Sequence, residues 1–164
     1  NIRLVLEIKS RMGLRYMSTV VCLFYIMSYA DGEVSHPCKQ KEAISTDKAP
    51  SAIGPYSQAI FAGSYVFVSG QIGMTPEGAI VDITAAGQTH QALENIGAIL
   101  DEAGLDFSHV VKSSVLLKDI NDYDEVNDVY KDYFPAPAPA RAAFQVAALP
   151  KNALVEIEVI AMVN

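Results

Sequence analysis

A turn dipeptide between two short segments rich in apolar residues predicts a β-hairpin at the start of the folded region. Two strand-like runs, 56–62 and 65–71, meet at residues 63–64, a Gly-Ser pair typical of a tight turn. A second turn is expected at 75–78, where Thr-Pro-Glu-Gly suits turn geometry. The region therefore opens with paired strands.

The spacing of apolar residues then changes to three and four, which predicts two helices. The first begins after an N-cap at Asp82 or Thr84 and ends at Gly104, a residue type that commonly terminates helices. The second follows a cap at Asn121 or Asp122. The expected buried residues are Ala92, Leu93, Ile96, Leu100 and Ala103 in the first helix, and Tyr123, Val126, Tyr130 and Tyr133 or Phe134 in the second.

Three further strands are predicted at 110–117, 141–148 and 153–163, the last two separated by a turn at 149–152. The order ββαβαββ defines an α+β fold. Helices placed between strands favour crossover connections and a mixed sheet with both helices on one face. The other face then has no helix to cover it. Because another copy of the chain is the simplest cover, we predict an oligomer.

The N-terminal residues differ from the rest of the chain. A basic stretch at 11–15 precedes an apolar run at 17–29 that ends in small residues, the order found in secretory signal peptides. The run is shorter than the ~20 residues of a membrane span. Two interpretations stay open for 1–30: a signal-like segment with a secretory or organellar address, or a mispredicted extension on a cytoplasmic enzyme. The polar residues 31–48 are expected to be a linker, and 49–164 form the domain.

Composition and charge narrow the function classes. With 51% hydrophobic and 19% charged residues, the chain is typical of a globular protein. Residues 45–164 contain six Lys/Arg and fifteen Asp/Glu, a net charge of −9, which disfavours binding to nucleic-acid phosphates. Cys22 and Cys38 both precede this region, and no histidine pair has metal-ligand spacing. The sequence therefore predicts a domain with neither a metal site nor a cysteine nucleophile.

Arg141 is the strongest candidate for a binding residue. It is the only arginine between residues 45 and 164, and it follows a Pro/Ala run at 135–140 whose prolines restrict the backbone. Its planar guanidinium suits bidentate binding of a carboxylate. A salt bridge to one of the many acids is the alternative, and the residues alone leave both open.

Several other polar residues lie in apolar surroundings. Glu156 alternates with apolar residues in the last strand; partial burial would raise its pKa and suit it to proton transfer, but an exposed edge glutamate fits equally. Tyr56 follows a Gly-Pro pair, and Asn127 lies beside the buried stripe of the second helix. Ser69 and Gly70 interrupt an apolar strand with small residues, which lets a ligand approach the backbone. Each of these also has a purely structural interpretation.

Five segments, taken in order, resemble the RidA/YjgF (L-PSP, translation initiation inhibitor) family over residues 45–164. They are 52–58 (AIGPYSQ), 68–73 (VSGQIG), 110–121 (VVKSSVLLKDIN), 139–143 (PARAA) and 155–161 (VEIEVIA). The resemblance implies a chorismate-mutase-like subunit in a homotrimer with three clefts between neighbours. It also implies hydrolysis of 2-aminoacrylate, 2-iminobutyrate and related imines to 2-keto acids and ammonia, with no cofactor, in the cytoplasm or a mitochondrion.

The resemblance also implies roles for particular residues. Arg141 matches the family's carboxylate-binding arginine, and Glu156 matches the glutamate that positions or activates water. Bacterial members often carry a cysteine two positions after the arginine, where this chain has Ala143, so the substrate site has no thiol there. The other substrate-binding positions of the cleft match Tyr56, Ser69, Gly70 and Asn127.

Two other functions stay open. Some family members are described as translation inhibitors or single-stranded-RNA endoribonucleases, a reading that the charge of −9 on residues 45–164 argues against. A non-catalytic, ligand-binding or chaperone-like trimer is the third interpretation. We therefore expect an imino acid as the partner of the domain, and neither nucleic acid nor membrane.

Overall fold

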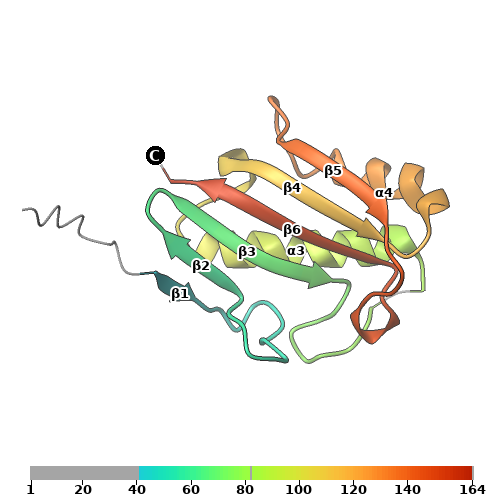
Figure 1. Cartoon of the computed structure of the whole chain (residues 1–164), viewed down its shortest axis with the longest axis horizontal. Coiled ribbons are helices and arrows are strands. Elements are labelled where there is room, and N and C mark those ends of the chain that lie inside the picture. Colours follow the sequence, from blue (N-terminus) through green and yellow to red (C-terminus); the bar gives the residue numbers. More distant parts are fainter. Residues whose placement is uncertain (1–40, 82, 164) are drawn as a thin grey trace, which may run out of the picture. The chain divides into compact units, whose positions relative to one another are not determined.

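The computed structural model describes residues 41–81 and 83–163. The signal-like segment 1–30, residues 31–40 of the expected linker, and Asp82 lie outside the described residues. The helices and strands, labelled as in Figure 1, are β1 (Glu42–Ile44), β2 (Ala59–Ala62), β3 (Tyr65–Ile72), α3 (Ala85–Glu102), β4 (Val110–Leu117), α4 (Tyr123–Tyr130), β5 (Ala140–Gln145) and β6 (Val155–Met162).

All seven predicted elements are confirmed, with ends that shift by a few residues. β4 has its predicted bounds, and α3 begins after Thr84, whose hydroxyl accepts a hydrogen bond from Gly87 N at 3.1 Å. Gly104, just beyond the end of α3, has a φ of 72°, which glycine adopts without strain. α4 follows Asp122 and is shorter than expected, because Tyr133 and Phe134 come after its last turn.

The sequence did not indicate β1. This strand lies within the segment expected to be a linker and pairs with β2, with Glu42 opposite Phe61. It has three residues, and its exposed side chains follow no clear alternation. Such a strand is held mainly by backbone pairing, which leaves no hydrophobic pattern in the sequence.

The six strands form one mixed sheet in the order β1-β2-β3-β6-β4-β5. All neighbours are antiparallel except β4 and β5, which are parallel. α3 therefore connects β3 to β4 across β6, and α4 connects the adjacent strands β4 and β5. Both helices are crossover connections, and α3 runs behind the sheet (Figure 1).

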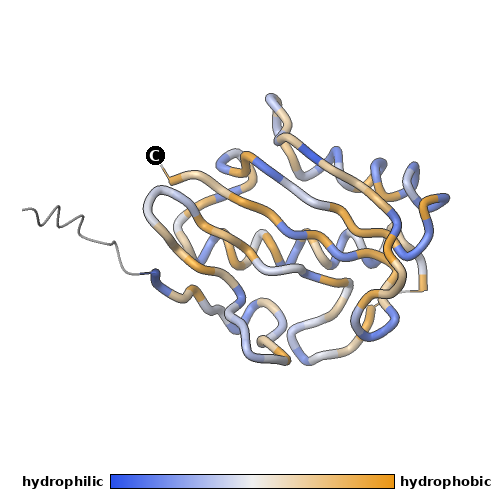
Figure 2. The backbone as a smooth tube through the Cα atoms, in the orientation of Figure 1, coloured by the Kyte–Doolittle hydropathy of each residue, from blue (hydrophilic) through white to orange (hydrophobic). Residues whose placement is uncertain are grey.

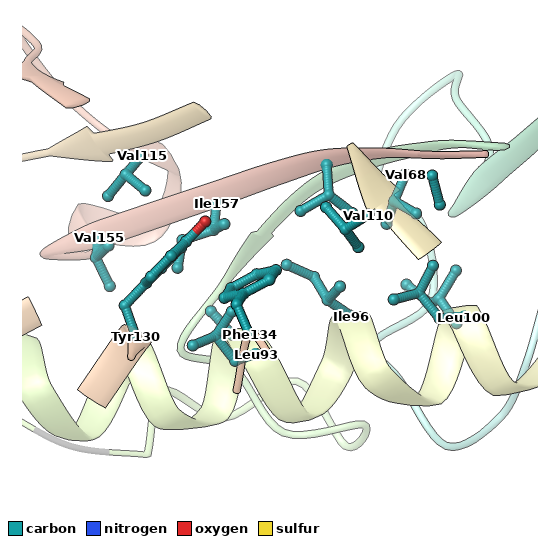
Figure 3. Packing of buried hydrophobic residues seen from close by; sticks show 14 of the residues in the cluster. Val68, Leu93, Ile96, Leu100, Val110, Val115, Tyr130, Phe134, Val155 and Ile157 are labelled. Carbon is teal, nitrogen blue, oxygen red and sulfur yellow. The ribbon is translucent and has the colours of Figure 1, made fainter. Parts of the chain in front are cut away.

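Both helices pack on the same face of the sheet, as predicted. Leu93, Ile96 and Leu100 of α3 point toward the strands, and Tyr130 of α4 joins them (Figure 3). Apolar residues concentrate along the central strands β3, β6 and β4 (Figure 2). In β6 the buried residues are Val155, Ile157, Val159 and Ala161. The residues between them point to the opposite face of the sheet.

In the described part of the chain, no helix covers that opposite face, which we call the open face. It carries the cross-strand pairs Tyr65–Met162 and Phe67–Ile160 of β3 and β6. Phe144 of β5, opposite Leu116 of β4, extends it. Phe67 is 45% exposed and Phe144 47%, so large apolar side chains lie in solvent here. The pair Ser114–Glu158 lies between these two apolar areas of the face. Exposed apolar areas bordered by polar residues are typical of interaction sites.

Candidate active site

Arg141 lies on the helix-covered side of the edge strand β5. It pairs with Ser113 of β4, which in turn pairs with Val159 of β6, and both partners are buried beneath the helices. Directly paired residues share a face of the sheet. The Arg141 side chain therefore points toward the helices, where it meets α4.

Two tyrosines of α4 hold the Arg141 guanidinium. Its central carbon lies 4.6 Å from the centre of the Tyr130 ring and 5.6 Å from that of Tyr123. Its Nη2 donates a hydrogen bond to the Tyr123 hydroxyl at 3.1 Å. Aromatic rings stabilise the cation without neutralising its charge. The prediction that Tyr123 belongs to the buried face was wrong: this residue is 38% exposed.

No ion pair occupies Arg141 within residues 41–81 and 83–163. The ion pairs of this part of the chain are Lys48–Asp101, His90–Glu94, His109–Asp106 and Lys131–Asp128. The interpretation of Arg141 as one half of a structural salt bridge thus finds no support among the described residues. Its contacts among these residues are instead the two tyrosines of α4.

Asn127 and Ala143 lie on the same side as the arginine. Tyr123, Asn127 and Tyr130 are spaced by four and three residues, so they share one face of α4, with Asn127 between the two rings. Ala143 follows Arg141 by two residues in β5 and shares its side of the strand. We call these five residues the arginine group.

Glu156 points to the open face. It pairs with Leu116 of β4, whereas Arg141 pairs with Ser113 of the same strand. Leu116 and Ser113 are three positions apart, so they point to opposite faces. Successive strand residues alternate between faces, so Glu156 and Arg141 lie on opposite sides of the sheet. Glu156 is half-buried, and this burial, followed by the negative charge of Glu158, raises the pKa of its carboxyl. A carboxyl with a raised pKa is better suited to exchange protons near neutrality.

Gly70 leaves the space that the Glu156 carboxylate occupies. The pairing of β3 with β6 shifts register between Val68 and Gln71, which makes the Ser69-Gly70 pair a bulge. A Cβ at Gly70 would lie 2.8 Å from Cδ of Glu156 and would overlap its carboxylate oxygen. The carboxylate can therefore lie against the backbone only because residue 70 has no side chain.

Ser69 joins this bulge to the segment before β2. Its Oγ donates to the carbonyl of Ser57 at 2.7 Å, and its N–H donates to the carbonyl of Gln58 at 2.9 Å. The adjacent Tyr56 is half exposed, and its hydroxyl accepts a hydrogen bond from Ile53 N at 3.3 Å, which leaves its own proton for another acceptor. We call Ser69, Gly70 and Glu156, at the bulge, the glutamate group; Tyr56 belongs to the segment that Ser69 contacts.

Two buried amides that the sequence analysis missed hold the strands of the glutamate group. Gln88 of α3 accepts a hydrogen bond from Leu154 N, just before β6, at 2.7 Å. Asn95, seven residues or about two turns later, donates to the carbonyl of Met74, just after β3, at 2.8 Å. The available signal was the presence of polar residues on the apolar face of a helix, where a buried amide needs a partner.

Within the two described ranges, no three His, Cys, Asp or Glu side chains are grouped so that they could bind a metal ion. None of the described helices is long and apolar enough to cross a membrane. The candidate catalytic features of this small α+β domain are an arginine that has no ion-pair partner among the described residues and a half-buried glutamate whose pKa is raised.

The chain belongs to the RidA/YjgF/L-PSP family. The family model described as Endoribonuclease L-PSP matches residues 46–163. A 2-iminobutanoate/2-iminopropanoate deaminase of Bos taurus is 58% identical over 123 residues, which cover 74% of this chain and 90% of the relative. Reactive Intermediate Deaminase A, chloroplastic, of Arabidopsis thaliana is 52% identical over 134 residues, covering 81% of this chain and 72% of the relative.

Solved structures agree with this assignment. The crystal structure of RidA from a Psychrobacter species matches with a TM-score of 0.72 at 46% identity, and the match covers 74% of this chain and 99% of that one. The family and the α+β fold expected from the sequence are thereby confirmed.

Proposed function

We propose that this chain is a 2-iminobutanoate/2-iminopropanoate deaminase, which hydrolyses reactive 2-imino acids to 2-keto acids and ammonia. The observation that carries the proposal is the Arg141 guanidinium, which has no carboxylate partner among the described residues. Its chemistry fits the acid group of the substrates named for the Bos taurus relative. The substrate scope also includes 2-aminoacrylate, the enamine form from which 2-iminopropanoate arises.

Each group has one task in the proposed reaction. Arg141 binds the substrate carboxylate through its planar fork and orients the imine carbon. Glu156 accepts a proton from water as the water oxygen bonds to that carbon, which gives a tetrahedral aminoalcohol. The same carboxyl first returns this proton to the nitrogen of the adduct and then carries the hydroxyl proton to the same nitrogen. The C–N bond breaks, and ammonia leaves as the keto group forms. Electrons and protons balance without a cofactor.

The first test is a coupled assay. Threonine dehydratase supplies 2-iminobutanoate, and release of 2-ketobutyrate is followed with and without this protein. We expect the protein to accelerate the loss of the imine well above its spontaneous hydrolysis. Binding of 2-ketobutyrate without any acceleration would instead favour the non-catalytic, chaperone-like interpretation.

We also propose that the protein is a homotrimer whose clefts lie between neighbouring subunits. Two observations support this. The arginine and glutamate groups lie on opposite sides of one sheet, so a single subunit does not bring them together. The open face also exposes large apolar side chains that an adjacent copy would cover. The number three comes from the family resemblance.

Hybrid oligomers test the shared cleft. Arg141→Ala and Glu156→Gln are each expected to be nearly inactive alone. If one subunit supplies the arginine group and its neighbour the glutamate group, randomly mixed trimers regain about a quarter of wild-type activity, because one cleft in four receives both intact groups. Light scattering of the same samples measures the oligomeric state. Hybrids that form but stay inactive would place both groups of a cleft in the same subunit.

A ribonuclease function is the second candidate, because the matching family model is described as an endoribonuclease. The charge of −9 on residues 45–164 disfavours it, since binding of RNA is driven mainly by cations that neutralise phosphates. Degradation of single-stranded RNA by the purified protein, lost in Arg141→Ala, would reverse the order of the two candidates.

The location of the protein in the cell is also a proposal. The Arabidopsis relative is named as chloroplastic. In this chain the basic and apolar segments within residues 1–30 precede the matched domain. We propose that they direct the chain to an organelle, in preference to the cytoplasm or the secretory route. Imaging of a fusion with and without residues 1–40 decides between these.

A further inference from the structure

The Tyr123 hydroxyl retains an unused donor beside the arginine. Its oxygen accepts the hydrogen bond from Arg141 Nη2 at 3.1 Å. A tyrosine hydroxyl carries one proton of its own, and no acceptor for that proton is present among the described residues. Tyr123 as a whole is 38% exposed, so its side chain is open to a molecule from solvent.

The surroundings of the guanidinium restrict how an anion can approach. The central carbon of the guanidinium lies over the buried Tyr130 ring, 4.6 Å from its centre, so the ring covers the guanidinium on that side. A carboxylate binds a guanidinium in the plane of its fork, at the N–H edge. Tyr123 lies at one end of this edge, next to Nη2. A carboxylate that contacts Nη2 therefore comes within reach of the tyrosine O–H.

We propose that Tyr123 is a further substrate-binding residue, whose hydroxyl donates a hydrogen bond to the same carboxylate that Arg141 binds. This inference rests on the proposed deaminase function and extends its carboxylate site. Two donors on one acid group favour a 2-imino or 2-keto acid over the corresponding neutral amide. The hydroxyl oxygen still accepts the hydrogen bond from Arg141, so Tyr123 contacts both the arginine and the substrate carboxylate.

The test compares Tyr123→Phe with the wild type and with Tyr133→Phe. The control variant also loses one hydroxyl, which bonds His90 and Glu94 on the outer surface. Affinities for 2-ketobutyrate and for 2-ketobutyramide are measured by calorimetry, and KM and kcat in the coupled assay. Tyr123→Phe should weaken binding of the keto acid about tenfold and raise KM, with kcat within about twofold of the wild type. Tyr133→Phe should behave as the wild type.

Binding of 2-ketobutyramide distinguishes the loss of a contact with the ligand from a change in the structure of the site. Tyr123→Phe and the wild type should bind 2-ketobutyramide alike, because it has no carboxylate. Unchanged keto-acid affinity in Tyr123→Phe would overturn the inference while the deaminase proposal stands. An equal loss of affinity for acid and amide would overturn it as well, since only a change in the shape of the site would then remain. A wild type that neither binds the keto acid nor hydrolyses the imine would refute both proposals.

Discussion

Replacing Arg141 by alanine is expected to lower kcat/KM for 2-iminobutanoate by about a thousandfold. In the proposed complex, the planar guanidinium makes two charge-assisted hydrogen bonds to the substrate carboxylate, each contributing roughly 1.5–3 kcal/mol. Binding of the carboxylate also orients the imine carbon for attack by water. The loss should appear both as weaker binding of 2-ketobutyrate and as slower turnover. Calorimetry and the coupled assay measure the two effects separately.

Two further variants make this prediction specific. Arg141→Lys keeps the charge but not the planar fork, and it should recover only part of the activity. Lys48→Ala removes a different cation, whose ion pair with Asp101 is mostly exposed, and it should leave activity unchanged. A rate for Arg141→Ala within about threefold of the wild type would remove the basis of the carboxylate site.

Most of the fold could be predicted from local sequence patterns. The β-branched run of β4 and the apolar spacing of α3 each mark an element that one buried face stabilises, so their bounds follow from the sequence. Thr84 and Gly104 mark the ends of α3 because capping is also a local interaction. β1 lacks such a signal, since its stability depends on a partner strand that is distant in sequence.

The placement of Arg141 and Glu156 on opposite faces of the sheet could not be predicted from the sequence. Alternation within β6 separates Glu156 from its apolar neighbours, but it does not say which face Arg141 shares. That depends on the strand order, because β4 lies between β5 and β6. The register of β4 with each neighbour determines whether Arg141 and Glu156 point to the same face or to opposite faces. The exposure of Tyr123 has a similar origin: helical periodicity places it on the inner stripe, but the sheet ends at β5 before covering it.

Replacing Glu156 by glutamine is expected to lower kcat about a hundred- to ten-thousandfold, the range of a well-placed general acid–base residue. Binding of 2-ketobutyrate should change little, because the carboxylate anchor lies in the arginine group. Gly70→Ala should lower kcat in the same way, since its methyl group would overlap the Glu156 carboxylate and displace it. Glu158→Gln, at an exposed position of the same strand face, should keep activity within about threefold of the wild type, because Glu158 is only the smaller cause of the raised pKa of Glu156.

The pH dependence gives a second, independent measure of Glu156. Burial raises the pKa of this carboxyl above its usual 4.5, so kcat should fall as the pH is lowered through the raised value, where the base becomes protonated. For stability the sign is opposite: a raised pKa stabilises the folded protein only while the group is protonated, and this contribution is lost as the pH rises through the folded pKa. Glu156→Gln should therefore have a higher Tm than the wild type at pH 7, and the difference should shrink toward pH 4. A lower Tm at pH 7 would mean that the carboxylate is stabilised in the fold, and its role as a proton acceptor would have to be abandoned.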